Sequence, residues 1–253
     1  MTLLALKLLL VPLLVCAISL AGHRWGPGVA GWLSGFPVIS APVLLFLAID
    51  QGTGFAAAAA VGTLSAVTAI LCFGIAYAWA ACRYTWLPSL GLSLGIYAVA
   101  VAAIDTLAPP LWAAAAMTLG AMLAAPRLFP HPPPPQSWTS PPALNLPFRM
   151  LAGAVLVLLV TGFAQRLGAR LSGMLAMFPV LGSVLAVFSH RQLGAGFVVP
   201  LLRGMVYGYY AFAAFCLALA LALPALGIAT SFLLALACAM LIQAGSRLLL
   251  GSL

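Results

Sequence analysis

The sequence predicts an all-α polytopic membrane protein of about nine transmembrane helices, arranged as two inverted four-helix repeats joined by a linking helix. Composition, the length of the apolar runs and an internal repeat lead to this prediction. Of the 253 residues, 65% are hydrophobic and 5% are charged, whereas soluble domains carry roughly 25% charged residues. Lipid is therefore the expected solvent for most of the surface.

The few charged residues are almost all basic. Acidic residues number two, Asp50 and Asp105, and the formal net charge is +8. The basic residues stand singly at the ends of apolar runs, which is typical of loop anchors and unlike the clustered basic surface that binds nucleic acid. The five cysteines form no paired motif, so the sequence indicates neither a disulfide framework nor a metal site, and no cofactor is expected.

Nine apolar runs approach the length of about 20 residues that a helix needs to cross the hydrocarbon layer. The run at 110–126 is short and is bounded by prolines on both sides. Residues 130–142 contain seven prolines, which predicts an extended linker outside the membrane. The predicted spans are 3–22, 28–49, 55–82, 87–107, 110–126, 149–166, 171–189, 197–222 and 225–246.

The strongest internal signal is a repeat at a shift of 142 residues. Arg24–Phe55 aligns without a gap with Arg166–Phe197, and eleven of the 32 positions are identical. A composition this biased would give roughly three identities by chance. The identical residues include a Phe-Pro-Val at 36–38 and 178–180, and a Gly-x-Gly-Phe at 52–55 and 194–197. The sequence therefore predicts a duplication, with repeat one at 1–107, a linking helix and linker at 108–148, and repeat two at 149–253.

If the linking helix crosses the membrane, an odd number of crossings separates equivalent points, so the repeats are inverted. The charge pattern agrees with this arrangement through a small excess of basic residues on one side. The positive-inside rule places that side in the cytoplasm. The predicted cytoplasmic side carries Arg24, Arg83, Arg127, Arg149, Arg191 and Arg247, and the other side carries Lys7, Arg166 and Arg170.

Two matching segments carry a family resemblance. Residues 30–39, AGWLSGFPVI, with Gly52 fifteen positions after Pro37, resemble the second helix of the small bacterial GlpM-like membrane proteins. Residues 172–180, SGMLAMFPV, with Gly194, fit the same pattern. The chain thus resembles two such units fused head to tail, over about 100 residues in each half. The resemblance implies four-helix units and a loose association with glycerol or exopolysaccharide phenotypes, and it implies no catalytic residue.

Prolines interrupt the second and seventh predicted spans at repeat-equivalent positions. A proline inside a helix frees a backbone carbonyl, and in hydrocarbon that carbonyl needs a partner in protein or in a water-filled cavity. Paired interruptions in two halves are typical of a transporter's substrate site, although a packing kink is the alternative. We expect the two Phe-Pro-Val segments to approach each other and line a polar cavity. The candidate substrate-binding residues are Ser34, Pro37, Ser40, Pro179, Ser183 and Arg203.

The charged candidates lie elsewhere in the predicted spans. An acid in or near lipid is a candidate proton site, and this makes Asp50 and Asp105 the predicted coupling residues. A helix-boundary role is the alternative for Asp50, which precedes two glycines. Arg203 falls inside the eighth span, where it either snorkels to the interface or holds an anionic group bidentately.

The predicted function is a small secondary transporter or exporter of the bacterial inner membrane, proton-coupled if it is coupled to an ion. Its expected partners are membrane lipids and an anionic or amphipathic small molecule, and the sequence leaves a homodimer open. A translocator of lipids or polyprenyl carriers and a non-transporting scaffold are the alternatives. No enzyme motif is present, so catalysis is not expected.

Overall fold

The computed structural model describes residues 2–132, 146–166 and 178–250, and this part of the chain is all α-helical. Six of its helices are long and apolar enough to cross a membrane, and two shorter apolar helices lie at Ser40–Gln51 and Leu146–Leu159. The chain is therefore a multi-pass membrane protein. The helices are α1 (Thr2–Trp25), α2 (Pro27–Ser34), α3 (Ser40–Gln51), α4 (Thr53–Ala81), α5 (Trp86–Leu107), α6 (Leu111–Leu128), α7 (Leu146–Arg166), α9 (Val180–Leu193), α10 (Ala195–Leu226) and α11 (Ile228–Leu250).

The predicted second span, 28–49, is not one continuous helix. It divides into α2 and α3, and Pro37 lies in the non-helical segment between them. Pro37 has no N–H to donate, and in a continuous helix its ring would clash with the carbonyl of Leu33. Of the predicted seventh span, 171–177 lies outside the described residues, and α9 begins directly after Pro179.

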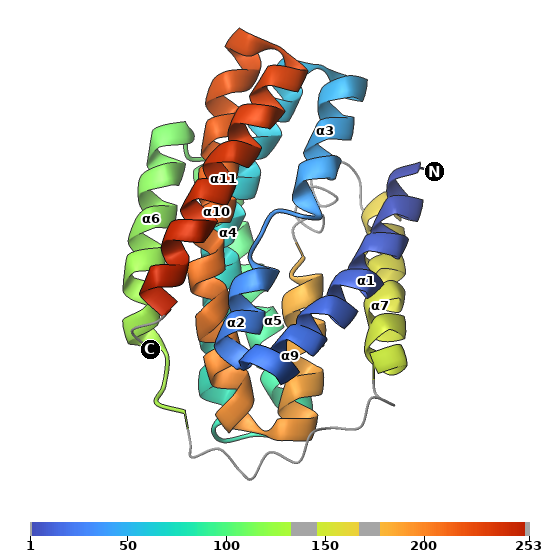
Figure 1. The fold of residues 1–253 in the computed structure, drawn as a ribbon, viewed down its shortest axis with the longest axis vertical. Coiled ribbons are helices and arrows are strands. Elements are labelled where there is room, and N and C mark those ends of the chain that lie inside the picture. The colour runs from blue at the N-terminus through green and yellow to red at the C-terminus, as the bar shows by residue number, and fades with distance from the viewer. Residues whose placement is uncertain (1, 133–145, 167–177, 251–253) are drawn as a thin grey trace.

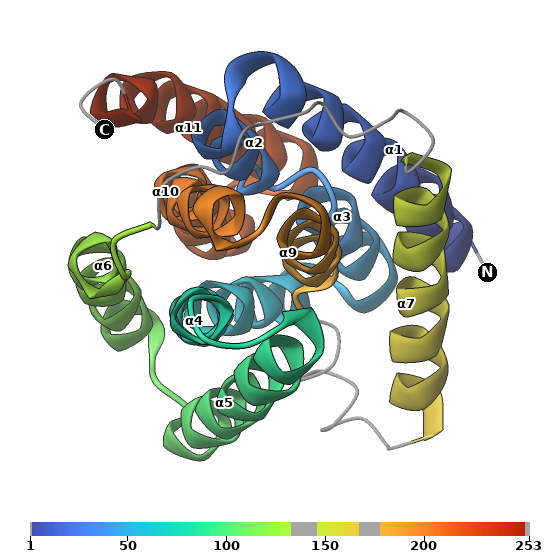
Figure 2. The same ribbon diagram turned by 90° about the horizontal axis from the view of Figure 1, so that it is seen from below.

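The two longest helices, α4 and α10, pack against each other in the centre of the molecule. Helices α5 and α6 cover α4, and α2 and α11 cover α10 (Figure 2). Helices α1 and α7 pack together at one side and both contact α9. The main apolar cluster lies along α4 and α10, so these two helices form the core that positions everything else.

Helices α4 and α10 run in opposite directions. The connections α3–α4 and α10–α11 lie at the upper end in Figure 1, and the connections α4–α5 and α9–α10 lie at the lower end. Helix α7 begins at the lower end and runs upward, whereas α1 runs downward (Figure 1). Of the described helices, α7 and α10 therefore run opposite to α1 and α4, respectively (Figure 1).

Helix boundaries recur at the same shift of 142 residues as the sequence identities. Helices α4 and α5 begin at Thr53 and Trp86, and α10 and α11 begin at Ala195 and Ile228. The α3–α4 junction has Gly52 at φ +88°, and the α9–α10 junction has Gly194 at φ +73°. Side chains other than glycine rarely adopt this backbone region, which explains why glycine stands at both junctions.

Candidate functional site

The two Phe-Pro-Val segments, called here the first and the second break, have the same backbone hydrogen bonds. In the first, Val38 N donates to Phe36 O at 2.8 Å and Ala41 N donates to Pro37 O at 2.9 Å. In the second, Val180 N donates to Phe178 O at 2.7 Å and Ser183 N donates to Pro179 O at 2.8 Å. Each proline is the central residue of an inverse γ-turn, with φ −75° and ψ 63° at Pro179. Helix α9 starts directly after Pro179, and α3 starts at Ser40, three residues after Pro37.

The carbonyls at the end of α2 find partners within the protein. Ser34 Oγ donates to Gly31 O at 2.6 Å, and Phe36 N donates to Leu33 O at 3.3 Å. Trp32 O accepts from Gln243 Nε2 of α11 at 3.1 Å. The first break therefore needs neither water nor ligand to satisfy these groups, and the hydroxyl of Ser34 serves as a local cap.

Glycines hold α2 directly against the backbone of α10. A Cβ atom on Gly31 would overlap the backbone of Leu201 and Met205, and one on Gly208 would overlap Trp32 O. Such close approach between helices is what small residues four apart permit. Because Trp32 Nε1 also donates to Ser246 Oγ of α11 at 2.8 Å, the first break is tightly packed on two neighbouring helices.

Three buried hydroxyl groups have no partner in the described part of the chain, and two of them lie beside the second break. Ser183, one turn into α9, is 3% exposed and its Oγ has no hydrogen-bond partner. Tyr97 of α5 is 5% exposed, packs edge-on against the ring of Phe178 at 6.1 Å, and its Oη also lacks a partner. Thr68 Oγ1 of α4 is a third such atom. Leaving a buried hydroxyl unpaired costs about 1–3 kcal/mol, so these groups require an explanation.

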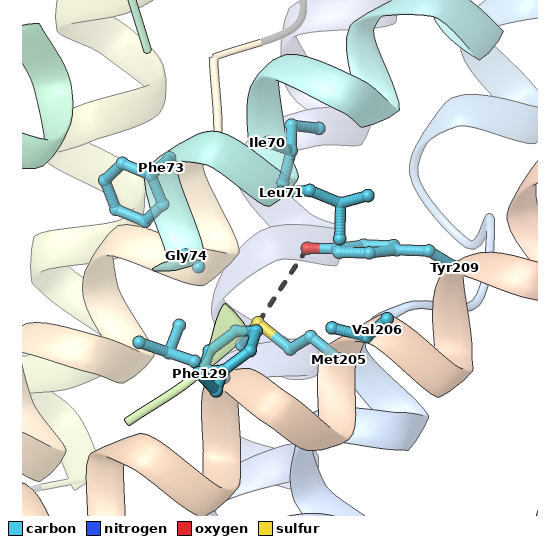
Figure 3. Close-up of a pocket in the computed structure, with 10 residues that line it drawn as sticks. Ile70, Leu71, Phe73, Gly74, Phe129, Met205, Val206 and Tyr209 are labelled. Carbon is cyan, nitrogen blue, oxygen red and sulfur yellow. Dashed lines mark hydrogen bonds between the residues drawn. The ribbon is translucent and has the colours of Figure 1, made fainter. Parts of the chain in front are cut away.

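A small cavity lies beside the first turn of α9. Its volume is about 10 Å³, which is room for about one water molecule. Figure 3 shows its walls, where Tyr209 Oη donates to Met205 Sδ at 3.8 Å. The cavity is lined by Ile70, Leu71, Phe73, Gly74, Phe129, Gly182, Leu202, Met205, Val206 and Tyr209. In this conformation it is too small to hold a solute.

The chain directly after each proline packs into one shared apolar cluster. Ile39 follows the first break, and Val180 and Leu181 follow the second. All three pack against the cluster of buried valines Val11, Val15, Val157 and Val184. Residues that follow the two prolines thus belong to one apolar cluster, and the approach of the two Phe-Pro-Val segments stays a prediction. The predicted cavity between the breaks is polar and lined by freed carbonyls, whereas this shared cluster is apolar. The polar cavity therefore stays a prediction.

The other predicted site residues lie on several helices. Ser40 is the first residue of α3 and is half-buried. Asp50 is exposed near the end of α3, and Asp105 is half-buried near the end of α5. Arg203 is half-buried on α10, and its Nε is buried without a hydrogen-bond partner. Within the described part of the chain, no hydrogen bond links Asp50 or Arg203 to either break.

Sequence reasoning missed a buried arginine. Arg149 was predicted to anchor a loop, but it lies on α7 and is 4% exposed. Its Nη1 donates to Ser19 Oγ at 3.1 Å and its Nη2 to Gln192 Oε1 at 2.6 Å. It also lies 5.8 Å from the ring of Phe188. The repeat alignment could have drawn attention to this position, because Arg149 aligns with Lys7 and both halves thus have a basic residue there.

No protein-family model, curated protein or solved structure matches this chain. The resemblance to GlpM-like units therefore stays a prediction.

Proposed function

We propose that this chain is a small secondary transporter or exporter of the bacterial inner membrane, built from two inverted four-helix repeats. The observation that carries the proposal is the same proline-centred turn, followed by a helix, at positions 142 residues apart. Inverted repeats with broken helices at matching positions are the usual construction of secondary transporters. The opposite directions of α4 and α10 support the inversion, with repeats at 1–107 and 149–253 and a linking segment at 108–148.

The solute site is the second break, where α9 begins. Both α3 and α9 begin near the middle of the long axis and run to opposite ends (Figure 1). A helix start carries about half a positive charge and free N–H groups, which suit an anionic or polar solute. At α9 the unpaired hydroxyls of Ser183 and Tyr97 add two hydrogen-bonding groups that a solute can use.

The small cavity beside α9 fits a closed conformation of such a transporter. Because it has room for about one water, a solute enters only when the helices around α9 repack. Alternating access in inverted-repeat transporters is a rocking motion of this kind. Ser40 and Arg203 are further candidate solute contacts, and Asp50 and Asp105 are the candidate proton sites.

Inverted topology is tested with repeat-equivalent cysteines. Tyr84 and Leu226 are related by the shift of 142, are 55% and 50% exposed, and lie at opposite ends of the molecule. With the five native cysteines replaced, Tyr84→Cys and Leu226→Cys should react with an impermeant maleimide from opposite sides of the membrane. Reaction from the same side would rule out inverted repeats.

Transport is tested with the purified chain in proteoliposomes. We expect saturable uptake of at least one member of a panel of small carboxylates and phosphate esters, and we expect Ser183→Ala to reduce it. Ser93→Ala is the matched control, because Ser93 Oγ is also buried but already bonds to Ser89 O at 2.7 Å. Lipid scrambling without solute uptake would favour the translocator of lipids. Loss of both activities would leave a non-transporting scaffold.

A further inference from the structure

The guanidinium of Arg149 is a buried charge whose hydrogen-bond partners are neutral. It joins α1, α7 and α9 through Ser19 Oγ and Gln192 Oε1. Among the described residues, these two oxygens engage two of its five N–H donors. A hydroxyl and an amide offer hydrogen bonds but do not cancel the charge.

The chain offers few carboxylates that could neutralise Arg149. Its acidic side chains are Asp50 and Asp105. Arg149 stands in the first turn of α7, at the lower end in Figure 1, whereas α3 carries Asp50 to the upper end. Helix α5 starts at the lower end and carries Asp105 near its far end. Neither acid therefore stands at the end of the molecule where Arg149 is buried.

Helix dipoles only partly offset this charge. The C-terminal end of α9, which carries Gln192, lies near Arg149 and contributes about half a negative charge. The N-terminal end of α7, on which Arg149 stands, contributes about half a positive charge. A buried ion without a formal partner costs several kcal/mol, and charges kept at such a cost within membrane segments usually mark solute or ion pathways.

The repeat shows which group is missing. At the shift of 142, Arg149 corresponds to Lys7, Ser19 to Thr161, and Gln192 to Asp50. The first half thus has a carboxylate at the position where the second half has an amide. An external anion would restore to Arg149 the negative charge that an acid at position 192 would have given it.

We propose that Arg149, Ser19 and Gln192 form a binding site for an oxyanion group, either a carboxylate or a phosphate. A guanidinium presents paired donors that match both groups. Gln192 is half-buried beside the exposed Arg191, and the exposed His23 lies close enough to feel the charge of Arg149. An anion approaching from this side replaces the amide oxygen of Gln192, while Phe188 forms the opposite wall.

This inference rests on the proposed transport function and specifies its substrate class. Arg149 contacts Gln192 near the end of α9, whereas Ser183 lies in the first turn of the same helix. The two sites are therefore separated by most of the length of α9. Arg149 would capture an anionic group at the predicted cytoplasmic end before it reaches the break.

The test measures the thermal stability of the full chain in neutral, lipid-free detergent. Inorganic phosphate is titrated at constant ionic strength, and phosphatidylglycerol is added in a separate series, to tell a soluble anion from a lipid headgroup. We expect a saturable rise in Tm of about 2–4 °C with at least one probe. Arg149→Gln should abolish the rise, whereas Arg83→Gln, which removes an exposed arginine at the same end, should leave it intact.

Gln192→Glu keeps the test decisive if Arg149→Gln does not fold. The new carboxylate should pair with Arg149, raise Tm in the absence of anion and remove the response to both probes. A wild-type chain that responds to neither probe would overturn the proposal, as would variants at 149 and 192 that respond like the wild type. Anion binding in detergent does not require transport. Binding without solute uptake would therefore contradict only the proposed transport function. Uptake without binding would contradict only the proposed anion site.

Discussion

The two helix breaks share one backbone geometry but have different surroundings. At the first break, α2 is held against α10 by glycines, and two of its last carbonyls accept from Ser34 and Gln243. The Oε1 atom of Gln243 is itself buried without a partner among the described residues. At the second, the buried hydroxyls of Ser183 and Tyr97 have no partners. Local sequence thus produces the turn in both places, and the neighbouring helices decide whether it is a packed joint or a polar site.

Repeat-equivalent positions show how the halves diverged. Ser183 and Tyr97 correspond, at the shift of 142, to Ala41 and Ala239, which belong to the apolar packing around α10 and α11. Gln243, which donates to a carbonyl at the first break, corresponds to the apolar Val101. Each break therefore has polar neighbours that are absent at the equivalent positions of the other. This exchange is what we expect if one break became an anchor and the other kept a site.

The largest expected effect concerns the anchor. Gly31→Ala places a Cβ atom against the backbone of Leu201, which cannot move without shifting α10. We expect a loss of stability of about 1–3 kcal/mol, or failure to fold, because overpacking forces backbone shifts. Gly120→Ala is the control, since Gly120 is an exposed helical residue with open space around it. Thermal unfolding in detergent measures both, and equal Tm values would contradict a locked first break.

Replacing the two prolines should affect solute uptake unequally, and the expected effect is of intermediate size. Pro179→Ala lets α9 extend backwards and removes the helix start from the site, so we expect solute uptake to fall roughly tenfold, as for loss of about 1.4 kcal/mol of binding. Pro37→Ala should leave uptake within about twofold, because the glycine contacts of α2 fix the first break independently of the turn. Initial uptake rates in proteoliposomes decide this, and equal losses for both variants would show that the breaks act as equals.

The third substitution should not lower the free energy of unfolding, although it changes a buried side chain. Tyr97→Phe removes a buried hydroxyl that has no partner, so we expect unchanged stability or a gain of up to about 1 kcal/mol, together with slower uptake. Thr118→Val is the control, because Thr118 Oγ1 donates to Leu64 O at 2.9 Å and its loss should destabilise the protein. A marked fall in Tm for Tyr97→Phe would mean that its hydroxyl has a structural role.

The smallest expected change in stability is for a substitution of Asp50, a predicted proton site. Asp50→Asn alters an exposed residue near the end of α3, so we expect Tm to change by less than the equivalent of about 0.5 kcal/mol. If Asp50 couples transport to protons, uptake should lose its dependence on a pH gradient. Uptake that still follows the gradient would restrict Asp50 to a helix-boundary role.

Several features followed from the sequence because they depend on local chemistry. Apolar runs of sufficient length specify membrane helices, since backbone groups in lipid must bond within the segment. Phe-Pro-Val at 36–38 and 178–180 marked both turns, because proline lacks the N–H of the helix ladder. Proline alone was not sufficient, since Pro12 and Pro200 stand inside the continuous helices α1 and α10. Gly52 and Gly194 marked both junctions, because the chain there has a positive φ.

Other features were decided only when distant segments packed together. Pro37 alone does not distinguish a kink from a full separation of α2 and α3, and the contact of Gly31 and Gly208 with opposing backbone makes that choice. Arg149 resembled a loop anchor because its neutral partners lie 130 and 43 residues away in the chain. The hydroxyl of Tyr97 has no partner among the described residues, and the sequence around position 97 does not show this. Hydrophobicity and helix-breaking act within one segment, whereas burial and the pairing of polar groups depend on which helices meet.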